Sequence, residues 1–588
     1  MSFTRMAIYF FYDRAGRLDE YVEIALRSLR PFVSRLILVA NGRIEGKDEA
    51  RLRAVVDEVI LRENEGFDVY AYRAGMESIG WEALGDVDEL LLLNHTFFAP
   101  IGSWDSAFSA AEAHPEASFW GLTDAPEASP HPFAAKASMP RHIQSHFIAV
   151  RRPLLREPEF RAYWEGMPPI RSYLDSIEHH ESRFTAHFEA LGHASFTVHP
   201  ASRFTSDNPS ILEAGELLDA GCPILKRRVF FHDPDYLEFH HVDGAELIAK
   251  ATARGYPEEV LLAGVARASS PRTLLLNAGL VESVKGAPSW PAAPLILTAE
   301  IESGAALSSF VELLDVLPPP ARAVLLCRGT LAGSVCESVG KQIAHLQILT
   351  MTGDDEGGAG SLLESPPSGP LSLMLRILAE EPEGSRSLYL NCGNLDDVHA
   401  KSFLASPTLL RGALDLFRTH ANLGLLLCGA RELPVNGRRL VPSERFAVVK
   451  GAAASCGIMT PLDRGIPLLE RDAPFIVRVE AISARMRERD GDACTALEVL
   501  QANEERLLLP SVITDSGFHI RHALAPGAGG VEKTLMWWRS AAALSSRAQE
   551  DRGSRRAEAL RLVLKSKVPA LSRVIVPVYR KVKRLLNS

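Results

Sequence analysis

The residues that could do chemistry fall into short polar clusters, and the first lies directly after a strand-like run. It contains Asn64, Gly66 and Asp68. A glycine there lets the backbone approach a ligand closely, while the amide and the carboxylate can hydrogen-bond sugar or base groups. The alternative is an ordinary turn in which Asp68 caps a helix that begins at Val69. The cluster therefore predicts either a ligand-binding loop or a capped turn.

A second cluster, Asn94-His95-Thr96, follows an acidic start and four consecutive leucines, Leu90–Leu93. Such a run is typical of a strand buried on both faces. In open α/β sheets ligands bind outside the carboxyl ends of the strands, which is where these three side chains fall. An ordinary core strand followed by a loop fits the same residues.

Two further clusters combine histidine, amide and carboxylate groups. Gln144 lies between His142 and His146, ahead of another buried strand. The alternation predicts a strand here, so the histidines do not form a helical metal-binding pair and we expect surface or packing roles. Glu181 lies near the start of a predicted amphipathic helix that ends at Gly192. Its carboxylate either complements the helix dipole or, if the helix start faces a cleft, acts as a general base.

The last cluster is a run of three cations, Lys226, Arg227 and Arg228. Clustered cations could meet a diphosphate, and a solvated surface triplet is the alternative.

Alternating strand and helix patterns must position these clusters. In the first region four strand-like runs are separated by helical patterns, which argues for a largely parallel sheet with helices on its faces. The runs are Met6–Tyr12, Leu36–Ala40, Glu58–Leu61 and Leu90–Asn94. The region after Pro294 begins with the same plan, which suggests an internal duplication.

Composition bounds the class of protein. The 588 residues exceed what one core usually supports, and 46% hydrophobic with 23% charged residues describes a globular chain. Seven scattered cysteines without a CxxC pair argue for reduced core thiols, and a net charge of −9 gives no case for nucleic-acid binding. No signal peptide pattern opens the sequence, so we expect a cytoplasmic location.

Two Pro- and Gly-rich stretches, 286–294 and 524–530, divide the chain into predicted domains at 1–285 and 295–515 and a tail at 531–588. From Asp551 onward the tail has about eleven Lys or Arg residues against two acids, interleaved with apolar residues. Such a segment could lie on an anionic membrane surface, on the inner face of the cell membrane. A solvated tail, or one packed on the protein's own acidic surface, is the alternative.

Taken in order, the clusters resemble the rhamnan synthesis protein F family, whose members are glycosyltransferase-like proteins of bacterial cell-surface polysaccharide assembly. The resemblance covers most of residues 5–285 and continues weakly through 398–417. The segments that carry it are Tyr12-Asp13, Arg62–Asp68, Leu90–Asn94, Phe119–Thr123, His142–Phe147, Glu181 and Ile224–Phe230.

The resemblance implies a glycosyltransferase A-type, Rossmann-like fold, a nucleotide-sugar donor, with dTDP-L-rhamnose expected, and a lipid-linked saccharide acceptor. It implies an inverting reaction in which Glu181 is the general base. The residues implied in donor binding are Asn64, Gly66, Asp68, Asn94, Gln144, Lys226, Arg227 and Arg228. Either a metal or the three cations would hold the departing diphosphate.

The chain departs from the family pattern at His95, because members commonly carry Asn-Asp-Ser after the leucine run. Manganese and magnesium prefer oxygen ligands, and imidazole is neutral. Three interpretations stay open: His95 binds manganese, catalysis is metal-free, or this copy does not catalyse.

The second domain departs further. Thr352–Gly358 lacks the asparagine-glycine-aspartate spacing, and Tyr389–Asn394 has no charge at its strand end. We therefore expect a degenerate domain with a scaffold or acceptor-binding role, in which Asp354 and Asp355 are solvated. Two functions follow: a glycosyltransferase, or a non-catalytic pseudo-glycosyltransferase that binds glycan or partner enzymes.

Overall fold

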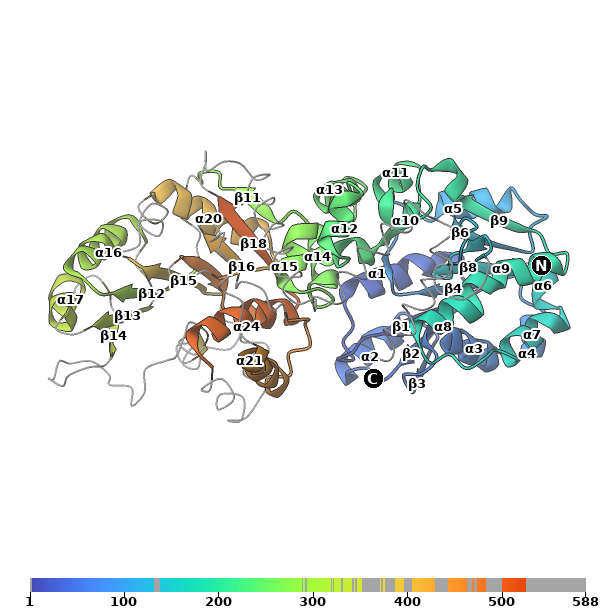
Figure 1. The fold of residues 1–588 in the computed structure, drawn as a ribbon, viewed down its shortest axis with the longest axis horizontal. Coiled ribbons are helices and arrows are strands. Elements are labelled where there is room, and N and C mark those ends of the chain that lie inside the picture. The colour runs from blue at the N-terminus through green and yellow to red at the C-terminus, as the bar shows by residue number, and fades with distance from the viewer. Residues whose placement is uncertain are drawn as a thin grey trace.

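The leucine run forms strand β4 (Glu89–Asn94), which is buried along its whole length at the centre of the first of two α/β sheets. Figure 1 shows the two sheets side by side in an elongated molecule, with helices on both faces of each. This computed structural model describes residues 3–131, 138–287, 289–290, 293–318, 320, 322–328, 331–340, 343, 346–351, 371, 374–375, 386–395, 404, 406–428, 443–462, 468–469, 473–482 and 500–524.

The first sheet has the order β3-β2-β1-β4-β8-β6, and both β7 and β9 pair with β6. Strands β1 to β4 are parallel, whereas β8 runs antiparallel to both of its neighbours, β4 and β6. The strands are β1 (Arg5–Tyr12), β2 (Arg35–Asn41), β3 (Glu58–Arg62), β6 (Phe119–Ala125), β7 (His142–Ile143), β8 (Phe147–Arg151) and β9 (Ser195–His199). Strands β5 (Phe97–Phe98) and β10 (Leu225–Lys226) form a separate antiparallel pair.

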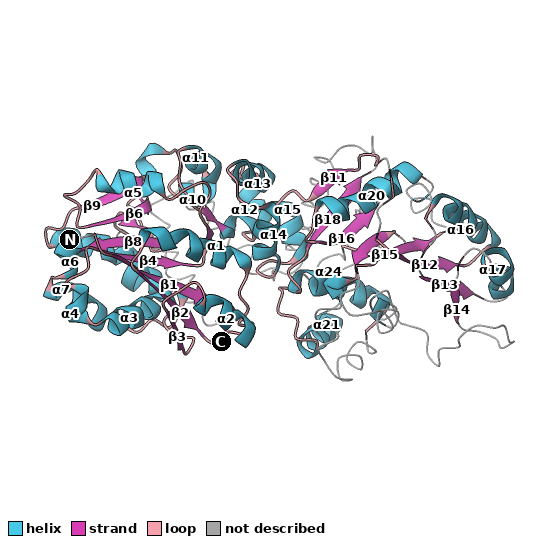
Figure 2. Ribbon diagram, turned by 180° about the vertical axis from the view of Figure 1, so that it is seen from behind, coloured by secondary structure: helices cyan, strands magenta, loops and turns pink. Residues whose placement is uncertain are grey.

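Helices cover both faces of this sheet, and each face has its own apolar core. The helices are α1 (Glu20–Leu29), α2 (Gly46–Arg53), α3 (Phe67–Ile79), α4 (Trp81–Leu84), α5 (Asp105–Glu112), α6 (Arg152–Leu155), α7 (Pro158–Glu165), α8 (Tyr173–Ser176), α9 (Ser182–Ala190), α10 (Pro209–Leu212) and α11 (Ala214–Asp219). Figure 2 shows the strands between these helical layers from the other side.

A buried carboxylate ties four strands of the first sheet together at their shared end. Glu89, 1% exposed, accepts hydrogen bonds from Arg5 Nε (2.6 Å), Trp120 Nε1 (2.8 Å) and Arg151 Nε (3.1 Å). These partners come from β1, β6 and β8. A buried charge is tolerated only when it is paired and hydrogen-bonded, so this contact fixes the register of the four strands.

Seven strands of the second sheet repeat the plan of the first, which confirms the shared plan expected from the sequence. The order is β11-β18-β16-β17-β15-β12-β13-β14. The parallel and antiparallel pairs from β18 to β14 match those of β9-β6-β8-β4-β1-β2-β3, and β11 is an additional edge strand. The strands are β11 (Val281–Ser283), β12 (Leu295–Ile301), β13 (Arg322–Arg328), β14 (Leu346–Met351), β15 (Leu388–Asn394), β16 (Leu423–Cys428), β17 (Phe475–Arg478) and β18 (His519–Leu524). Its helices include α16 (Gly304–Val316), α17 (Leu331–Val339), α20 (Pro407–Thr419), α21 (Ser443–Ser455) and α24 (Ala502–Asp515).

Four helices lie between the two sheets (Figure 1): α12 (Pro234–Phe239), α13 (Gly244–Ala253), α14 (Glu258–Ala266) and α15 (Pro271–Asn277). Arg521 on β18 pairs with Glu258 on α14 and Glu282 on β11. Arg17, in the loop after β1, donates to the carbonyl of Asp515 (2.8 Å) and to its carboxylate (3.0 Å). Buried ion pairs therefore join the first sheet and the linking helices to the second.

The α/β class predicted for both domains is confirmed, and the domain boundaries stay predictions. Strand β11 belongs to the second sheet although it precedes the Pro- and Gly-rich stretch at 286–294. The helical tail predicted at 531–588 and the loop with Asp354 and Asp355 lie outside the described residues. In the described part, no helix is long and apolar enough to cross a bilayer.

Candidate active site

The carboxyl end of β4 brings together two of the predicted residues. Asn94 Nδ2 donates to Asp68 Oδ2 (3.1 Å), and Asn94 Oδ1 accepts from the backbone N–H (3.2 Å) and hydroxyl (2.6 Å) of Thr96. Helix α3 begins at Phe67 with Gly66 as its N-cap, so Asp68 lies inside the first turn and is not the cap. Its carboxylate is thereby turned toward the end of β4.

The backbone conformation and the space at position 66 require glycine, in addition to the predicted close approach of a ligand. The φ of Gly66, 66°, is left-handed, and a Cβ there would lie 2.1 Å from the ring of Tyr70. Only glycine meets both demands. The neighbouring loop is held by Asn41, whose Nδ2 donates to the carbonyl of Phe67 (3.2 Å). Asn64 is exposed in this loop.

Glu181 is aimed by a π-helix, residues Ile177–Glu181, that runs directly into α9. Its Oε2 accepts hydrogen bonds from the hydroxyl (2.5 Å) and the backbone N–H (3.1 Å) of Ser145, in the turn between β7 and β8. His142 Nε2 lies 3.9 Å from its Oε1. The side chain is 24% exposed, so one carboxylate oxygen is fixed and the group still reaches solvent.

Lys226 reaches the same place from a distant part of the chain. Strand β10 pairs with β5, with Lys226 opposite Phe97, directly after the end of β4. Its ammonium interacts electrostatically with the carboxylates of Glu181 and Asp68. The cluster therefore combines two carboxylates, one amide and one cation at the carboxyl end of parallel strands, where α/β sheets bind ligands.

The local charges divide the two carboxylates into different ionisation ranges. Burial and the negative Glu181 raise the pKa of Asp68 to about 6. Burial alone would also raise the pKa of Glu181, but His142, the Ser145 hydrogen bonds and Lys226 outweigh it and lower the pKa. Burial lowers the pKa of Lys226 to about 8, against the opposing effect of Glu181. Glu181 therefore has the lower pKa of the two carboxyls and is ionised at neutral pH.

His95 and Arg227 lie in a separate group of contacts. The His95 ring packs against the rings of Phe10 and Phe11, at 5.4 and 5.7 Å, and burial lowers its pKa to about 3. Arg227 donates to the carbonyls of His95 (3.3 Å) and Gly264 (2.5 Å), and its guanidinium covers the ring of Tyr21 at 4.4 Å. Both side chains brace the loop after β4, while their sequence neighbours Asn94 and Lys226 enter the site.

The remaining predicted residues take varied places. Gln144 Oε1 accepts from Thr123 Oγ1 (2.7 Å), which anchors the turn that carries Ser145. Arg228 is exposed and lies beside the Tyr173 hydroxyl. His146 is buried against Phe97 and has a packing role, as expected.

The described side chains form no ready-made cage for a divalent metal. No group of three or more His, Cys, Asp or Glu residues that could hold an ion occurs in the described ranges. The oxygen of Asn94 is already engaged by Thr96, and the unpartnered His95 Nδ1 is buried away from solvent. Nothing around the ring supports the prediction that His95 binds manganese.

Sequence reasoning missed the residues that hold Glu181. Ser145 and His142 belong to the motif quoted for the family resemblance, but their contact with Glu181 depends on the approach of α9 to the β7–β8 turn. The sequence pattern predicted an ordinary helix and not the π-helix at Ile177–Glu181. Mid-helix π turns are frequent at functional sites, and this one ends at the carboxylate.

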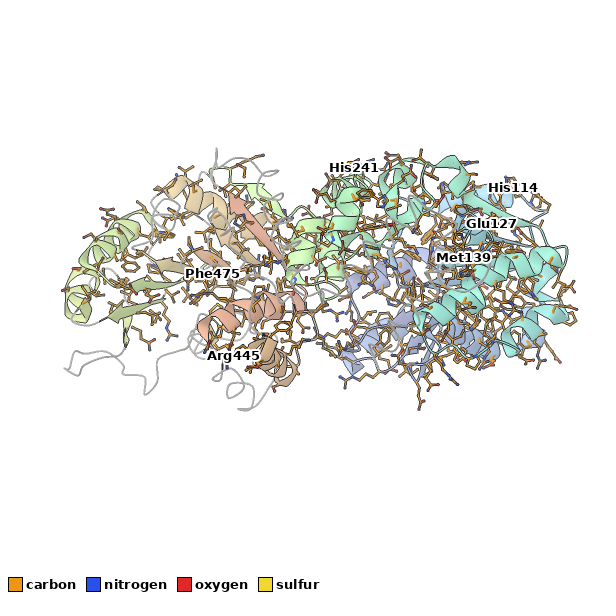
Figure 3. All side chains as sticks on the ribbon, viewed as in Figure 1. His114, Glu127, Met139, His241, Arg445 and Phe475 are labelled. Carbon is orange, nitrogen blue, oxygen red and sulfur yellow. The ribbon has the colours of Figure 1, made fainter. Side chains whose placement is uncertain are left out.

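The second sheet offers a comparison within the same chain. Helix α24 precedes β18 as α9 precedes β9. The carboxylate in its first turn, Glu504, is held by Arg445 of α21 through two contacts of 2.5 Å. Figure 3 labels Arg445 in the second domain. Within the described residues, Glu181 has no arginine or lysine at ion-pair distance. The carboxylate in the second unit is therefore neutralised where Glu181 is not.

Comparison with known sequences places this site in a family context. Residues 36–288 match the model of the rhamnan synthesis protein F family. The resemblance suspected from the motifs is thereby confirmed for this part of the chain, and the matched range contains the whole Asp68–Asn94–Glu181–Lys226 cluster. A curated relative, "Uncharacterized protein y4gN" of Sinorhizobium fredii, is 23% identical over 189 residues, or 32% of this chain. The chain spans less than half, 46%, of that relative's length.

Solved structures with partial similarity include three proteins. CMP:2-keto-3-deoxy-manno-octonic acid synthetase complexed with CTP has a TM-score of 0.22 and 15% identity over 37% of this chain and 99% of that one. For 4-diphosphocytidyl-2C-methyl-D-erythritol synthase of Anaerococcus prevotii the TM-score is 0.24 and the identity 12%, over 42% of this chain and 97% of that one. For core-mannan synthase A of Aspergillus fumigatus in its Mn/GDP form the TM-score is 0.19 and the identity 9%, over 33% of this chain and 70% of that one.

Replacing Ser145 tests how Glu181 is held. In Ser145→Ala the carboxylate loses its hydroxyl donor, so the pKa of Glu181 should rise by about one unit, equivalent to about 1.4 kcal/mol. Isotope-edited infrared titration of labelled glutamate, with Glu181→Gln to identify the band, measures it. Ser106→Ala, whose hydroxyl faces the carbonyl of Gly221, is the control. An unchanged Glu181 titration in Ser145→Ala would contradict the assignment.

Proposed function

We propose that this protein is an inverting glycosyltransferase that adds rhamnose, or a related deoxysugar, from a nucleotide-sugar donor to a lipid-linked cell-surface polysaccharide. The family match supports a glycosyltransferase-type role in polysaccharide synthesis. The observation that carries the proposal is the Glu181 carboxylate, held by two hydrogen bonds from Ser145, next to Lys226 at the carboxyl end of β4. dTDP-L-rhamnose is the donor that we would test first.

In the proposed reaction Glu181 removes the proton from an acceptor hydroxyl as its oxygen attacks the anomeric carbon. The bond from that carbon to the diphosphate oxygen breaks, and its electron pair leaves with the diphosphate. A neutral hydroxyl is a poor nucleophile, so a base that is ionised at neutral pH is required to take its proton. Attack opposite the leaving group inverts the anomeric centre.

Negative charge builds on the leaving diphosphate, and a preorganised cation in a partly buried site stabilises it. Lys226 supplies that charge. Asp68 and Asn94 offer a carboxylate and an amide to donor hydroxyls, with the loop around Asn64 and Gly66 beside them. No step is assigned to a metal.

Glu181→Gln is the direct test of the base. The amide cannot accept the proton, so kcat should fall by about a hundredfold or more, while the donor still binds. Product formation from dTDP-L-rhamnose and a rhamnan oligosaccharide measures kcat, and thermal stabilisation by dTDP measures donor binding. Glu178→Gln, on the same π-helix, is the control and should keep its activity.

If dTDP-L-rhamnose and other nucleotide sugars neither stabilise the wild-type protein nor give product, the proposal fails. A non-catalytic, glycan-binding protein of the assembly machinery would then be the better account.

The pKa of Lys226 predicts how donor binding depends on pH. The ammonium form binds diphosphate, so affinity for dTDP should be full below about pH 8 and fall as the pH rises through it. Lys226→Met should bind about tenfold or more weakly and lose this dependence, whereas Lys226→Arg should keep tight binding to higher pH. Calorimetric titration between pH 6.5 and 9.5 gives the constants, and a parallel pH curve in Lys226→Met would exclude this lysine.

We further propose that the tail at 531–588 attaches the protein to an anionic membrane surface on the cytoplasmic side, where a lipid-linked acceptor would be met. Its excess of basic over acidic residues, interleaved with apolar ones, supports this. Removal of 531–588 should release the protein from vesicles containing phosphatidylglycerol in a flotation assay. Equal binding with and without the tail would show that it is not the anchor.

A further inference from the structure

The segment that leads into Glu181 presents unusual side chains to solvent. Residues Tyr173 and Leu174, in the short helix α8, are 54% and 47% exposed. The backbone beneath them is ordered by a reciprocal capping box between Ser172 and Asp175, and Ile170 N–H donates to Tyr70 Oη on α3 (3.3 Å). An exposed aromatic ring is thus held on a well-fixed segment.

Tyr173 lies close to the site. Helix α8 continues without a break into the π-helix that ends at Glu181. The Arg228 guanidinium lies beside the Tyr173 hydroxyl, and the carboxylates of Glu181 and Asp68 act on it electrostatically. The ring therefore lies near the base, the second carboxylate and a cation, and the proposed reaction gives it no role.

We propose that Tyr173 is the platform on which a sugar ring of the saccharide acceptor stacks, next to the hydroxyl that Glu181 deprotonates. The inference rests on the proposed glycosyltransferase function and names its acceptor-side contact. The apolar face of a pyranose ring fits an exposed aromatic face, and the phenol hydroxyl keeps a polar edge for the sugar's own hydroxyls. Leu174, which is also exposed, extends the apolar surface beside the ring.

The acceptor, and not the donor, fits this ring for a geometric reason. In an inverting displacement the nucleophile approaches opposite to the leaving diphosphate, so the acceptor lies on the side of the base. The cation that meets the diphosphate, Lys226, comes from the β5–β10 pair at the sheet edge. Tyr173 instead belongs to the segment that carries Glu181. A ring on that segment flanks the incoming hydroxyl.

The test compares Tyr173→Ala and Tyr173→Phe with the wild-type full-length protein. The probe is an octyl glycoside of a rhamnose disaccharide, whose contact with the protein is followed by saturation-transfer NMR and whose KM is measured with dTDP-L-rhamnose. Loss of the ring should raise the acceptor KM by about tenfold, whereas Tyr173→Phe should stay near the wild-type value. The Kd for dTDP should change less than about twofold in either variant.

The matched control is Phe3→Ala. Phe3 is an aromatic side chain, 59% exposed, ahead of the amino end of β1 and so at the opposite edge of the sheet from the site. It should leave both constants unchanged.

Each other outcome overturns the inference. If Tyr173→Ala weakens dTDP and leaves the acceptor KM intact, the ring serves the donor. If it changes neither, the ring has no part in binding. If the wild-type protein binds neither dTDP nor the disaccharide, the proposed function itself fails. If dTDP binds and turnover occurs while Tyr173→Ala keeps the acceptor KM, only the acceptor platform is wrong.

Discussion

The candidate site depends on a carboxylate at the far end of the same strands. Glu89 joins β1, β4, β6 and β8 through three charged or indole N–H donors, and it is too buried to be left unpaired. Because side chains alternate along a strand, a slip of one residue in any of the four would send the wrong set to each face. At the other edge these strands deliver Asn94, Thr123 and the turn with Ser145. Desolvating these charges costs free energy, so the contact adds little net stability. Its effect is to fix where the polar groups of the site lie.

Around the site itself, unequal environments give similar groups different roles. Asp68 and Glu181 repel each other, and His142 together with the hydrogen bonds from Ser145 gives Glu181 the lower pKa of the two. Lys226 then balances the negative pair without forming a closed ion pair, which leaves its charge available to a ligand. The second unit shows the contrasting arrangement, since Arg445 closes on Glu504 and satisfies it fully. A carboxylate that is fixed but not neutralised is the property that separates the two copies.

Much of this arrangement could be predicted from the sequence, and the failures have a common cause. Strand and helix alternation gave the α/β plan and the repeated second unit, and motif order gave Asp68, Asn94, Glu181 and Lys226. The same reasoning could not separate Asn94 from His95, or Lys226 from Arg227. Adjacent residues at a strand end point to opposite sides, so one of each pair enters the site and the other braces the loop behind it. The roles of Ser145 and Tyr173 depend on the packing of α8, the π-helix and the β7–β8 turn against one another. This packing is tertiary, so no local sequence pattern predicts it.

Strand β11 has a consequence for how the chain can be divided and how it folds. It lies before the Pro- and Gly-rich stretch yet pairs with β18, and its Glu282 meets Arg521, 239 residues further along. A fragment that ends at the apparent linker would keep β11 without its partner strand, and a second fragment that starts there would lack its edge strand. During synthesis, β11 stays unpaired until almost the whole described chain has been made, so closing the second sheet is a late, long-range step. The two domains look separable, but β11, which precedes the linker, pairs with β18, the last described strand of the second sheet.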